Sequence, residues 1–350
     1  MIKMQRRKNF RFLSLIAIIV HLQLIKCKSF ETKGSSVASG INYEYVYVEA
    51  SNNNGSKGAI LFLHGFPSSS YSWRHQIDYF SKEGYDCLAP DLMGYGKTYS
   101  PLETKEYKMK SMAEHLTTLL NQLEIDKVIV VAHDWGTRLA SRFALYYPER
   151  TLGVTLISGA YGRPALFDLD LAIETSIKAV GYEILGYWKF FEANDAAKII
   201  EDNIDSFIDI IFPNDTTLWK TNFILLGKLR DWLINKNRTN RASYLTDTDY
   251  AIIRQYLSEG MQPKLNWYKA LIENNDWNDE KDLDPVIKKP FLYLGGTKDP
   301  VSIIAAYQEP NPYIQDLEII PLNTGHWVME EDPHGVNECI HKWIDKTKKD

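Results

Sequence analysis

The seven residues VVAHDWG at positions 130–136 decide which fold this sequence can adopt. They follow a short apolar run and precede a helical pattern, so the chain is expected to turn sharply from strand to helix at Asp134. Ala132 and Gly136 are the small residues that such a tight turn requires on either side of the raised side chain. Asp134 is therefore a candidate nucleophile, and the alternative is an aspartate that caps the following helix.

Short apolar runs on both sides of this turn predict a parallel β-sheet. We expect strands at residues 43–49, 59–63, 85–89, 127–132, 154–158, 290–295 and 317–321. Periodic segments predict helices at residues 108–123, 137–147 and 336–346. Strands that alternate with helices in this way are typical of an α/β fold with helices on both faces of the sheet.

A long segment interrupts this alternation. Residues 164–284 are rich in aromatic side chains, helical in pattern and without a convincing buried strand. We expect them to form a helical cap over the carboxyl ends of the strands, where sheets of this kind bind ligands. The core domain would then consist of residues 30–163 and 285–350.

Two later segments carry candidate partners for Asp134. Asp299 follows the apolar run 291–294 in a glycine-rich turn, and His326 lies in Gly325-His326-Trp327 after another predicted strand. The order nucleophile, acid, histidine is that of α/β hydrolases. Histidine suits a base that works near neutral pH, and a carboxylate on its second nitrogen fixes the tautomer. We expect Asp299 and His326 to activate water beside Asp134.

The segment HGFP at residues 64–67 follows the predicted strand 59–63. In this fold, the corresponding loop supplies one backbone N–H of an oxyanion hole, and the residue after the nucleophile supplies the other. Phe66 and Trp135 are therefore the expected donors. An ordinary strand-to-loop turn is the alternative, because Gly and Pro favour turns in any case.

With these motifs in place, the sequence resembles the epoxide hydrolases of the α/β-hydrolase fold, an aspartate-nucleophile group related to haloalkane dehalogenases. The resemblance spans nearly the whole chain after residue 29. It implies a mostly parallel sheet with an inserted helical cap, and attack of Asp134 on an epoxide carbon. Water activated by His326 and Asp299 would then hydrolyse the alkyl ester to a vicinal diol. Its motifs are HGFP at 64–67, SWR at 72–74, APDLMGYG at 89–96, HDWG at 133–136 and GHW at 325–327.

The resemblance also assigns two cap tyrosines. LNWYK at 265–269 is similar to the cap segment with one family tyrosine, here Tyr268, and GYWKFF at 186–191 to the segment with the other, here Tyr187. Two phenols can donate to the oxygen of an opening epoxide, whereas a departing halide is held by indole or amide N–H groups. The tyrosines therefore favour an epoxide, and a haloalkane or fluoroacetate dehalogenase with the same nucleophile, acid and base is the alternative. Packing is the alternative role for each tyrosine.

An apolar epoxide and water are the expected substrates. The residues expected to line an apolar pocket are His64, Trp135, Trp188, Phe191 and Trp267.

Charge and motif content argue against other ligands. The net charge is -5, and it becomes -12 without residues 1–29, which carry seven basic residues and no acid. Such a surface would repel nucleic acid. No metal or organic cofactor is expected, since the sequence lacks His-Glu-x-x-His and Cys-x-x-Cys, and the Gly94-Tyr95-Gly96 spacing is not that of a dinucleotide loop.

Residues 1–29 have the pattern of a signal peptide, with a basic start, the apolar run 12–20 and small residues near position 29. The alternative, a membrane anchor, would need about 20 apolar residues, so we expect no stable span and delivery to the endoplasmic reticulum lumen or secretion. Asn-x-Ser/Thr triplets at Asn54, Asn214 and Asn237 are compatible with glycosylation there. Cys87 and Cys339 are expected to be buried free thiols rather than a disulfide.

Overall fold

The computed structural model describes residues 30–37, 40–51, 55–307 and 311–348. The segment 1–29, expected to be a signal peptide, and the triplet at Asn54 lie outside the described residues. Within the described ranges, no helix combines the length and the apolar content that a membrane crossing needs.

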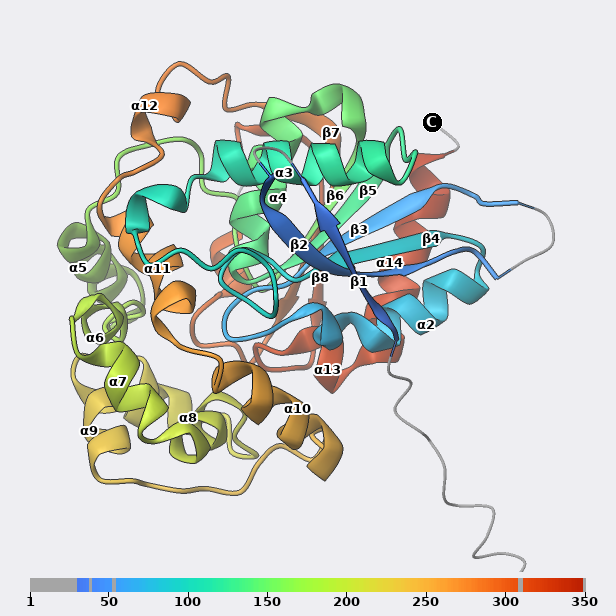
Figure 1. Ribbon diagram of the computed structural model, residues 1–350. Coiled ribbons are helices and arrows are strands. Elements are labelled where there is room, and N and C mark those ends of the chain that lie inside the picture. Colours follow the sequence, from blue (N-terminus) through green and yellow to red (C-terminus); the bar gives the residue numbers. More distant parts are fainter. Residues whose placement is uncertain (1–29, 38–39, 52–54, 308–310, 349–350) are drawn as a thin grey trace, which may run out of the picture.

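Eight strands of the described chain form one sheet in the order β1-β2-β4-β3-β5-β6-β7-β8 (Figure 1). β2 pairs antiparallel with β1 and β4, and the remaining pairs are parallel. The strands are β1 (Thr32–Ser36), β2 (Asn42–Val48), β3 (Ala59–Leu63), β4 (Asp86–Pro90), β5 (Val128–His133), β6 (Thr151–Ile157), β7 (Ile287–Gly296) and β8 (Ile314–Leu322).

Seven of these strands correspond to the predicted apolar runs, and β1 was missed. Its sequence, Thr-Lys-Gly-Ser-Ser, is polar and mostly exposed, so it carries no hydrophobic pattern from which a strand could be recognised. β3 and β5 are buried along their whole length. Uninterrupted apolar runs of this kind are expected where helices cover both faces of a sheet.

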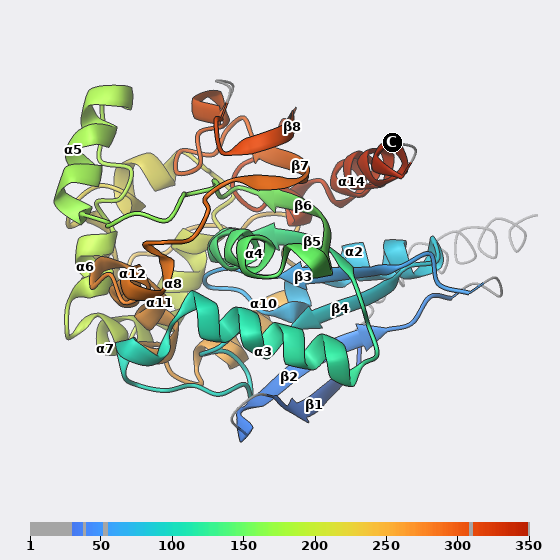
Figure 2. The same ribbon diagram turned by 90° about the horizontal axis from the view of Figure 1, so that it is seen from above.

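Four long helices cover the sheet, as Figures 1 and 2 show. α3 (Met109–Gln122) packs against α4 (Trp135–Tyr146) on one face, and α2 (Arg74–Lys82) packs against α14 (Pro333–Thr347) on the other. The predicted helices 108–123, 137–147 and 336–346 are α3, α4 and α14. α4 begins directly after Asp134, so the sharp strand-to-helix turn is present.

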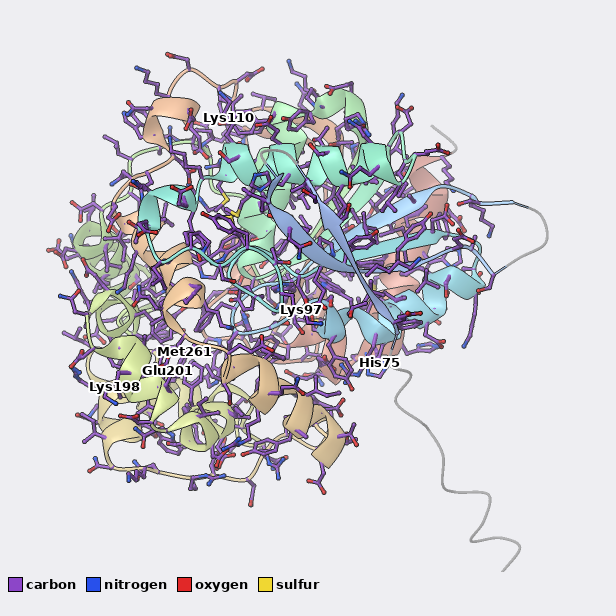
Figure 3. All side chains as sticks on the ribbon, viewed as in Figure 1. His75, Lys97, Lys110, Lys198, Glu201 and Met261 are labelled. Atoms are coloured by element: carbon purple, nitrogen blue, oxygen red, sulfur yellow. The ribbon has the colours of Figure 1, made fainter. Side chains whose placement is uncertain are left out.

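Between β6 and β7 the chain is helical, and we call α5 to α12 the cap. These helices lie together to one side of the sheet (Figure 1). The Met261 N–H donates to Glu201 Oε1 at 2.7 Å and joins the start of α11 to the end of α7 (Figure 3). The division at 164–284 stays a prediction. The cap helices are α5 (Leu169–Val180), α6 (Trp188–Glu192), α7 (Ala196–Glu201), α8 (Ile204–Ile211), α9 (Lys228–Ile234), α10 (Asp247–Leu257), α11 (Gln262–Ile272) and α12 (Trp277–Glu280).

A buried ion pair attaches the cap to α4. Arg142 Nε donates to Glu280 Oε1 at 2.7 Å, and its Nη2 donates to Glu280 Oε2 at 2.9 Å. Both side chains are almost fully buried. Two parallel hydrogen bonds fix the relative orientation of the two groups as well as their distance. The helix that starts at the candidate nucleophile is therefore tied to α12.

The two cysteines of the described chain are free thiols. Cys87 is fully buried in β4, as expected. Cys339 is a free thiol as predicted, but its predicted burial is wrong: it is only half-buried, because Val336, Ile340 and Ile344 form the buried face of α14. Asn214 and Asn237 are both exposed.

Candidate active site

Asp134 lies at a strained turn between β5 and α4. Its φ of 49° and ψ of -122° are unusual for a residue with a side chain. Glycines provide the room: a Cβ on Gly65 would lie 2.4 Å from Asp134 Oδ1, and a Cβ on Gly136 would lie 2.3 Å from the Leu63 carbonyl oxygen. An aspartate that caps a helix accepts the N–H of the second or third helical residue. Asp134 makes no such bond to α4, so the helix-cap alternative is wrong.

Two backbone N–H groups converge on the Asp134 carboxylate. The Phe66 N–H donates to Oδ1 at 2.7 Å, and the Trp135 N–H lies close enough to lower the pKa of the same carboxylate. These are the two donors that the sequence predicted for an oxyanion hole: Phe66 lies in the loop after β3, and Trp135 is the first residue of α4. Because the donors are fixed by the backbone, they are preorganised for negative charge at this point.

The predicted acid and base lie on the other side of the same carboxylate. His326 Nδ1 is 2.7 Å from Asp299 Oδ2, and His326 Nε2 is 3.7 Å from Asp134 Oδ2. Asp299 Oδ1 accepts the backbone N–H groups of Val301 and Ser302 at 2.8 and 3.1 Å. A carboxylate held in this way keeps the proton on Nδ1 and leaves Nε2 free to take a proton from water beside Asp134.

Burial and charge act in opposite directions at this pair. Burial would lower the pKa of His326, but the carboxylates of Asp299 and Asp134 outweigh it and raise that pKa. Burial raises the pKa of Asp134, although His326 and the two N–H donors lower it in part. The Asp134 side chain keeps 18% of its surface exposed, so an incoming atom can reach it.

The two predicted phenols come from the cap, and the ring centroid of Tyr268 lies 5.0 Å from that of Phe66 and 4.8 Å from that of Trp135. Tyr187 precedes α6 and Tyr268 lies within α11, with exposed fractions of 6% and 2%. Burial raises the pKa of both phenols, and the Asp134 carboxylate raises each of them further. The rings lie 6.3 Å apart. Both hydroxyls therefore stay protonated and can donate to an oxygen held between them and Asp134.

Aromatic rings enclose the space around these hydroxyls. Trp188 stacks on Trp135 with 5.3 Å between the ring centroids. The ring centroid of Phe191 lies 5.1 Å from that of Phe66 and 4.8 Å from that of Tyr268. The structure therefore brings Trp135, Trp188 and Phe191 together beside the predicted nucleophile.

Two other predicted pocket residues have structural partners. His64 is fully buried, its Nε2 accepts the Leu92 N–H at 2.9 Å, and its Nδ1 is 2.9 Å from the Gly65 carbonyl oxygen. Burial lowers the pKa of His64 to about 4. Its ring nitrogens are therefore not available to a substrate, and His64 fixes the loop instead. Trp267 donates its indole N–H to the Met93 carbonyl oxygen at 2.8 Å, with its ring 6.1 Å from Trp135.

Two further residues contact the base, and the sequence did not predict this contact for either of them. His133 Nε2 lies 3.0 Å from the His326 carbonyl oxygen, and its ring is 4.8 Å from the His326 ring. Trp219, from the cap, lies 5.1 Å from the same ring. The position of His133 next to Asp134 could have indicated its contact, whereas nothing local in the sequence places Trp219 there. The described residues hold no cluster of three or more His, Cys, Asp or Glu side chains arranged for a metal.

Comparisons with known proteins agree with this geometry. Residues 58–201 match the family described as alpha/beta hydrolase fold. A solved epoxide hydrolase from an endophytic Streptomyces superposes with a TM-score of 0.76, at 24% identity over 92% of this chain and 97% of the other. That likeness shows the fold. Fold and site together thus define an α/β hydrolase with an aspartate at the nucleophile turn.

Proteins with similar sequences identify the family within this fold. "Epoxide hydrolase 3" of Siraitia grosvenorii is 43% identical over 322 residues, which cover 83% of this chain and 93% of the relative. "Bifunctional epoxide hydrolase 2" of Rattus norvegicus is 30% identical over 318 residues, or 88% of this chain, which spans only about half (54%) of that relative's length. The chain belongs to the epoxide hydrolase family of the α/β-hydrolase fold.

Proposed function

We propose that this protein hydrolyses an apolar epoxide to a vicinal diol through an alkyl ester on Asp134. The observation that carries the proposal is that the two oxygens of the Asp134 carboxylate have different neighbours. Oδ1 accepts the Phe66 N–H, Oδ2 lies 3.7 Å from His326 Nε2, and Tyr187 and Tyr268 lie close enough for the carboxylate to raise the pKa of both phenols. A serine at this turn would attack a carbonyl, whereas a carboxylate can displace an oxygen from saturated carbon. The names of the relatives support the same chemistry.

In the first step, Asp134 attacks one epoxide carbon and the bond from that carbon to the epoxide oxygen breaks. The electron pair goes to the oxygen, which receives hydrogen bonds from Tyr187 and Tyr268 and takes a proton from one of these phenols. The product is a hydroxyalkyl ester. Because the phenols are buried and preorganised, they stabilise the forming alkoxide more than water could.

In the second step, His326 Nε2 takes a proton from water, and the resulting hydroxide attacks the carbonyl carbon of the ester. The Phe66 N–H, which contacts Oδ1, and the Trp135 N–H stabilise the tetrahedral oxyanion. Asp299 stabilises the imidazolium until the diol leaves with the proton. Asp134 is released as the acid and passes its proton, through solvent, to the phenolate formed in the first step, which restores both the carboxylate and the phenol.

The proposal predicts where solvent oxygen goes. After a single turnover of an epoxide in heavy-oxygen water, the label should appear in the Asp134 carboxylate, since water attacks the ester carbonyl and not the epoxide carbon. Peptide mass spectrometry measures it. Label confined to the diol would mean direct hydration of the epoxide and would refute the ester. The dehalogenase alternative is assayed in the same preparation: free halide from haloalkanes without diol from epoxides would replace the proposal.

We further propose that residues 1–29 direct the chain into the secretory pathway and that Asn214 and Asn237 carry glycans. Their exposure supports this, because a glycan needs a surface position. Expression in a eukaryotic cell should give a product that starts near residue 30 and loses mass on enzymatic deglycosylation. An intact N-terminus in the cell lysate, with no such mass loss, would contradict both parts.

A further inference from the structure

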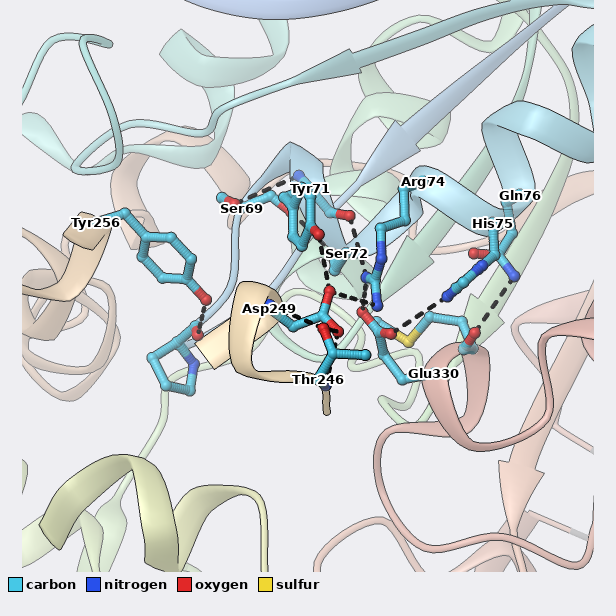
Figure 4. A network of polar contacts seen from close by, with 12 residues as sticks. Ser69, Tyr71, Ser72, Arg74, His75, Gln76, Thr246, Asp249, Tyr256 and Glu330 are labelled. Carbon is cyan, nitrogen blue, oxygen red and sulfur yellow. Dashed lines mark hydrogen bonds and ion pairs between the residues drawn. The ribbon is translucent and has the colours of Figure 1, made fainter. Parts of the chain in front are cut away.

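Three elements meet at a buried charge cluster outside the site described above (Figure 4). Arg74 opens α2, Asp249 lies on cap helix α10, and Glu330 lies on α13 (Val328–Glu331). Arg74 Nη1 donates to Glu330 Oε1 at 2.6 Å, and its Nη2 is 3.2 Å from Asp249 Oδ1. The exposed fractions of these residues are 5%, 2% and 8%. We call the three residues the Arg74 cluster.

The cluster holds one guanidinium between two buried carboxylates. Asp249 is fixed from its other sides, since the Tyr71 hydroxyl donates to Oδ1 at 2.7 Å and the Thr246 N–H donates to Oδ2 at 2.8 Å. Without the guanidinium, two carboxylates would face each other away from water, which is strongly unfavourable. Arg74 therefore joins α10 to α13 through buried charges. If the guanidinium is lost, water cannot easily replace it between the two carboxylates.

α13 is the segment that follows the candidate base. It begins two residues after His326, and the Glu330 N–H donates to the Trp327 carbonyl oxygen at 2.9 Å. Gln76 Nε2, from α2, lies 3.4 Å from the Met329 carbonyl oxygen. The position of Glu330 thus restrains the short turn of chain that leaves His326.

The helix that carries Tyr268 has separate attachments to the core. In α11, Trp267 donates to the Met93 carbonyl oxygen at 2.8 Å, and Asn266 Nδ2 donates to the Leu102 carbonyl oxygen at 3.0 Å. These contacts do not involve the Arg74 cluster. A loss of the Asp249 contact can therefore disturb α10 and α13 while the phenol keeps its place.

We propose that Arg74 is a positioning residue for His326, which links the placement of cap helix α10 to that of the base. This inference rests on the proposed two-step function, in which Asp134 and the phenols perform alkylation and His326 performs ester hydrolysis. The cluster then acts on hydrolysis and leaves alkylation nearly unchanged. A purely structural ion pair would affect both steps together.

The test separates the two steps by pre-steady-state kinetics on a small epoxide. Arg74→Met and Asp249→Asn should alkylate at close to the parent rate but hydrolyse the ester about 10- to 100-fold more slowly, the range expected when a catalytic group moves by up to about 1 Å. Arg74→Lys should lie between, because one ammonium cannot reproduce the guanidinium fork. The matched control is Arg254→Met on α10, the helix that carries Asp249. It removes a partly exposed ion pair with Asp205 at 2.7 Å and should change neither rate.

A measurement without substrate tests the same coupling. Amide hydrogen exchange of residues 325–331 should be faster in Asp249→Asn than in the parent, and unchanged in Arg254→Met. Equal slowing of both steps in Asp249→Asn, or parent-like hydrolysis and exchange, would overturn the inference. Asp249→Asn keeps the shape of the side chain, so it decides the question if Arg74→Met does not fold. If the parent forms no ester, the proposed function fails, while the exchange result still stands for or against the coupling.

Discussion

His326→Gln is expected to alkylate once and then stop. Glutamine is similar in length to histidine but cannot take a proton from water, so the ester on Asp134 should persist. Loss of a positioned general base typically costs 10²- to 10⁴-fold, and we expect hydrolysis to slow by about this factor. Intact-protein mass spectrometry should show a rise equal to the mass of the epoxide that remains for many parent turnover times.

The matched control is His334→Gln, an 83% exposed histidine on α14, which should turn over like the parent. The imidazole is buried against Asp299, so its replacement could unfold the protein. The His326 variant must therefore unfold at a temperature close to that of the parent. A folded His326→Gln protein that accumulates no adduct, or that hydrolyses its adduct at the parent rate, would remove His326 from the role of base.

Tyr187→Phe and Tyr268→Phe are expected to slow alkylation by roughly 10- to 1000-fold each, the scale of losing one preorganised donor. The double variant should be nearly inactive, since no donor would remain opposite Asp134. Hydrolysis of an ester already formed should change little, because that step uses the Phe66 and Trp135 N–H groups on the other side of the cleft. Rapid-quench measurement of ester formation separates the two steps.

A packing role predicts a different result. Phenylalanine keeps the ring contacts, such as that of Tyr268 with Phe66 at 5.0 Å, so packing alone would leave alkylation at the parent rate. Tyr250→Phe is the control, because it removes a cap hydroxyl that donates to Asp205 and does not reach the site. If Tyr268→Phe alkylates like the parent, Tyr268 is a packing residue. The cap tyrosines would then no longer favour an epoxide hydrolase over a dehalogenase.

Much of the core could be predicted because two structural requirements restrict its local sequence. The turn at Asp134 needs Gly136 for steric room, and the buried strands need uninterrupted apolar residues on both faces. The polar edge strand β1 has neither constraint, and it was missed. His64 was predicted for the pocket from its motif, but its ring nitrogens are taken up by the backbone of neighbouring loops. A motif gives the position of a residue and not the direction of its polar atoms.

The sequence by itself determined the α/β fold with its helical insertion, and the order of Asp134, Asp299 and His326 along the chain. Only the tertiary structure decided that the Asp134 carboxylate lies between the Phe66 N–H and His326. It also decided that Trp219 and His133 contact the base. It alone revealed the Arg74 cluster, whose members stand 175 and 81 residues apart along the chain. Local patterns record which residues must be small, apolar or turn-forming, because those needs are met by neighbours in sequence. Contacts between distant segments depend on how whole helices pack, and no local pattern records them.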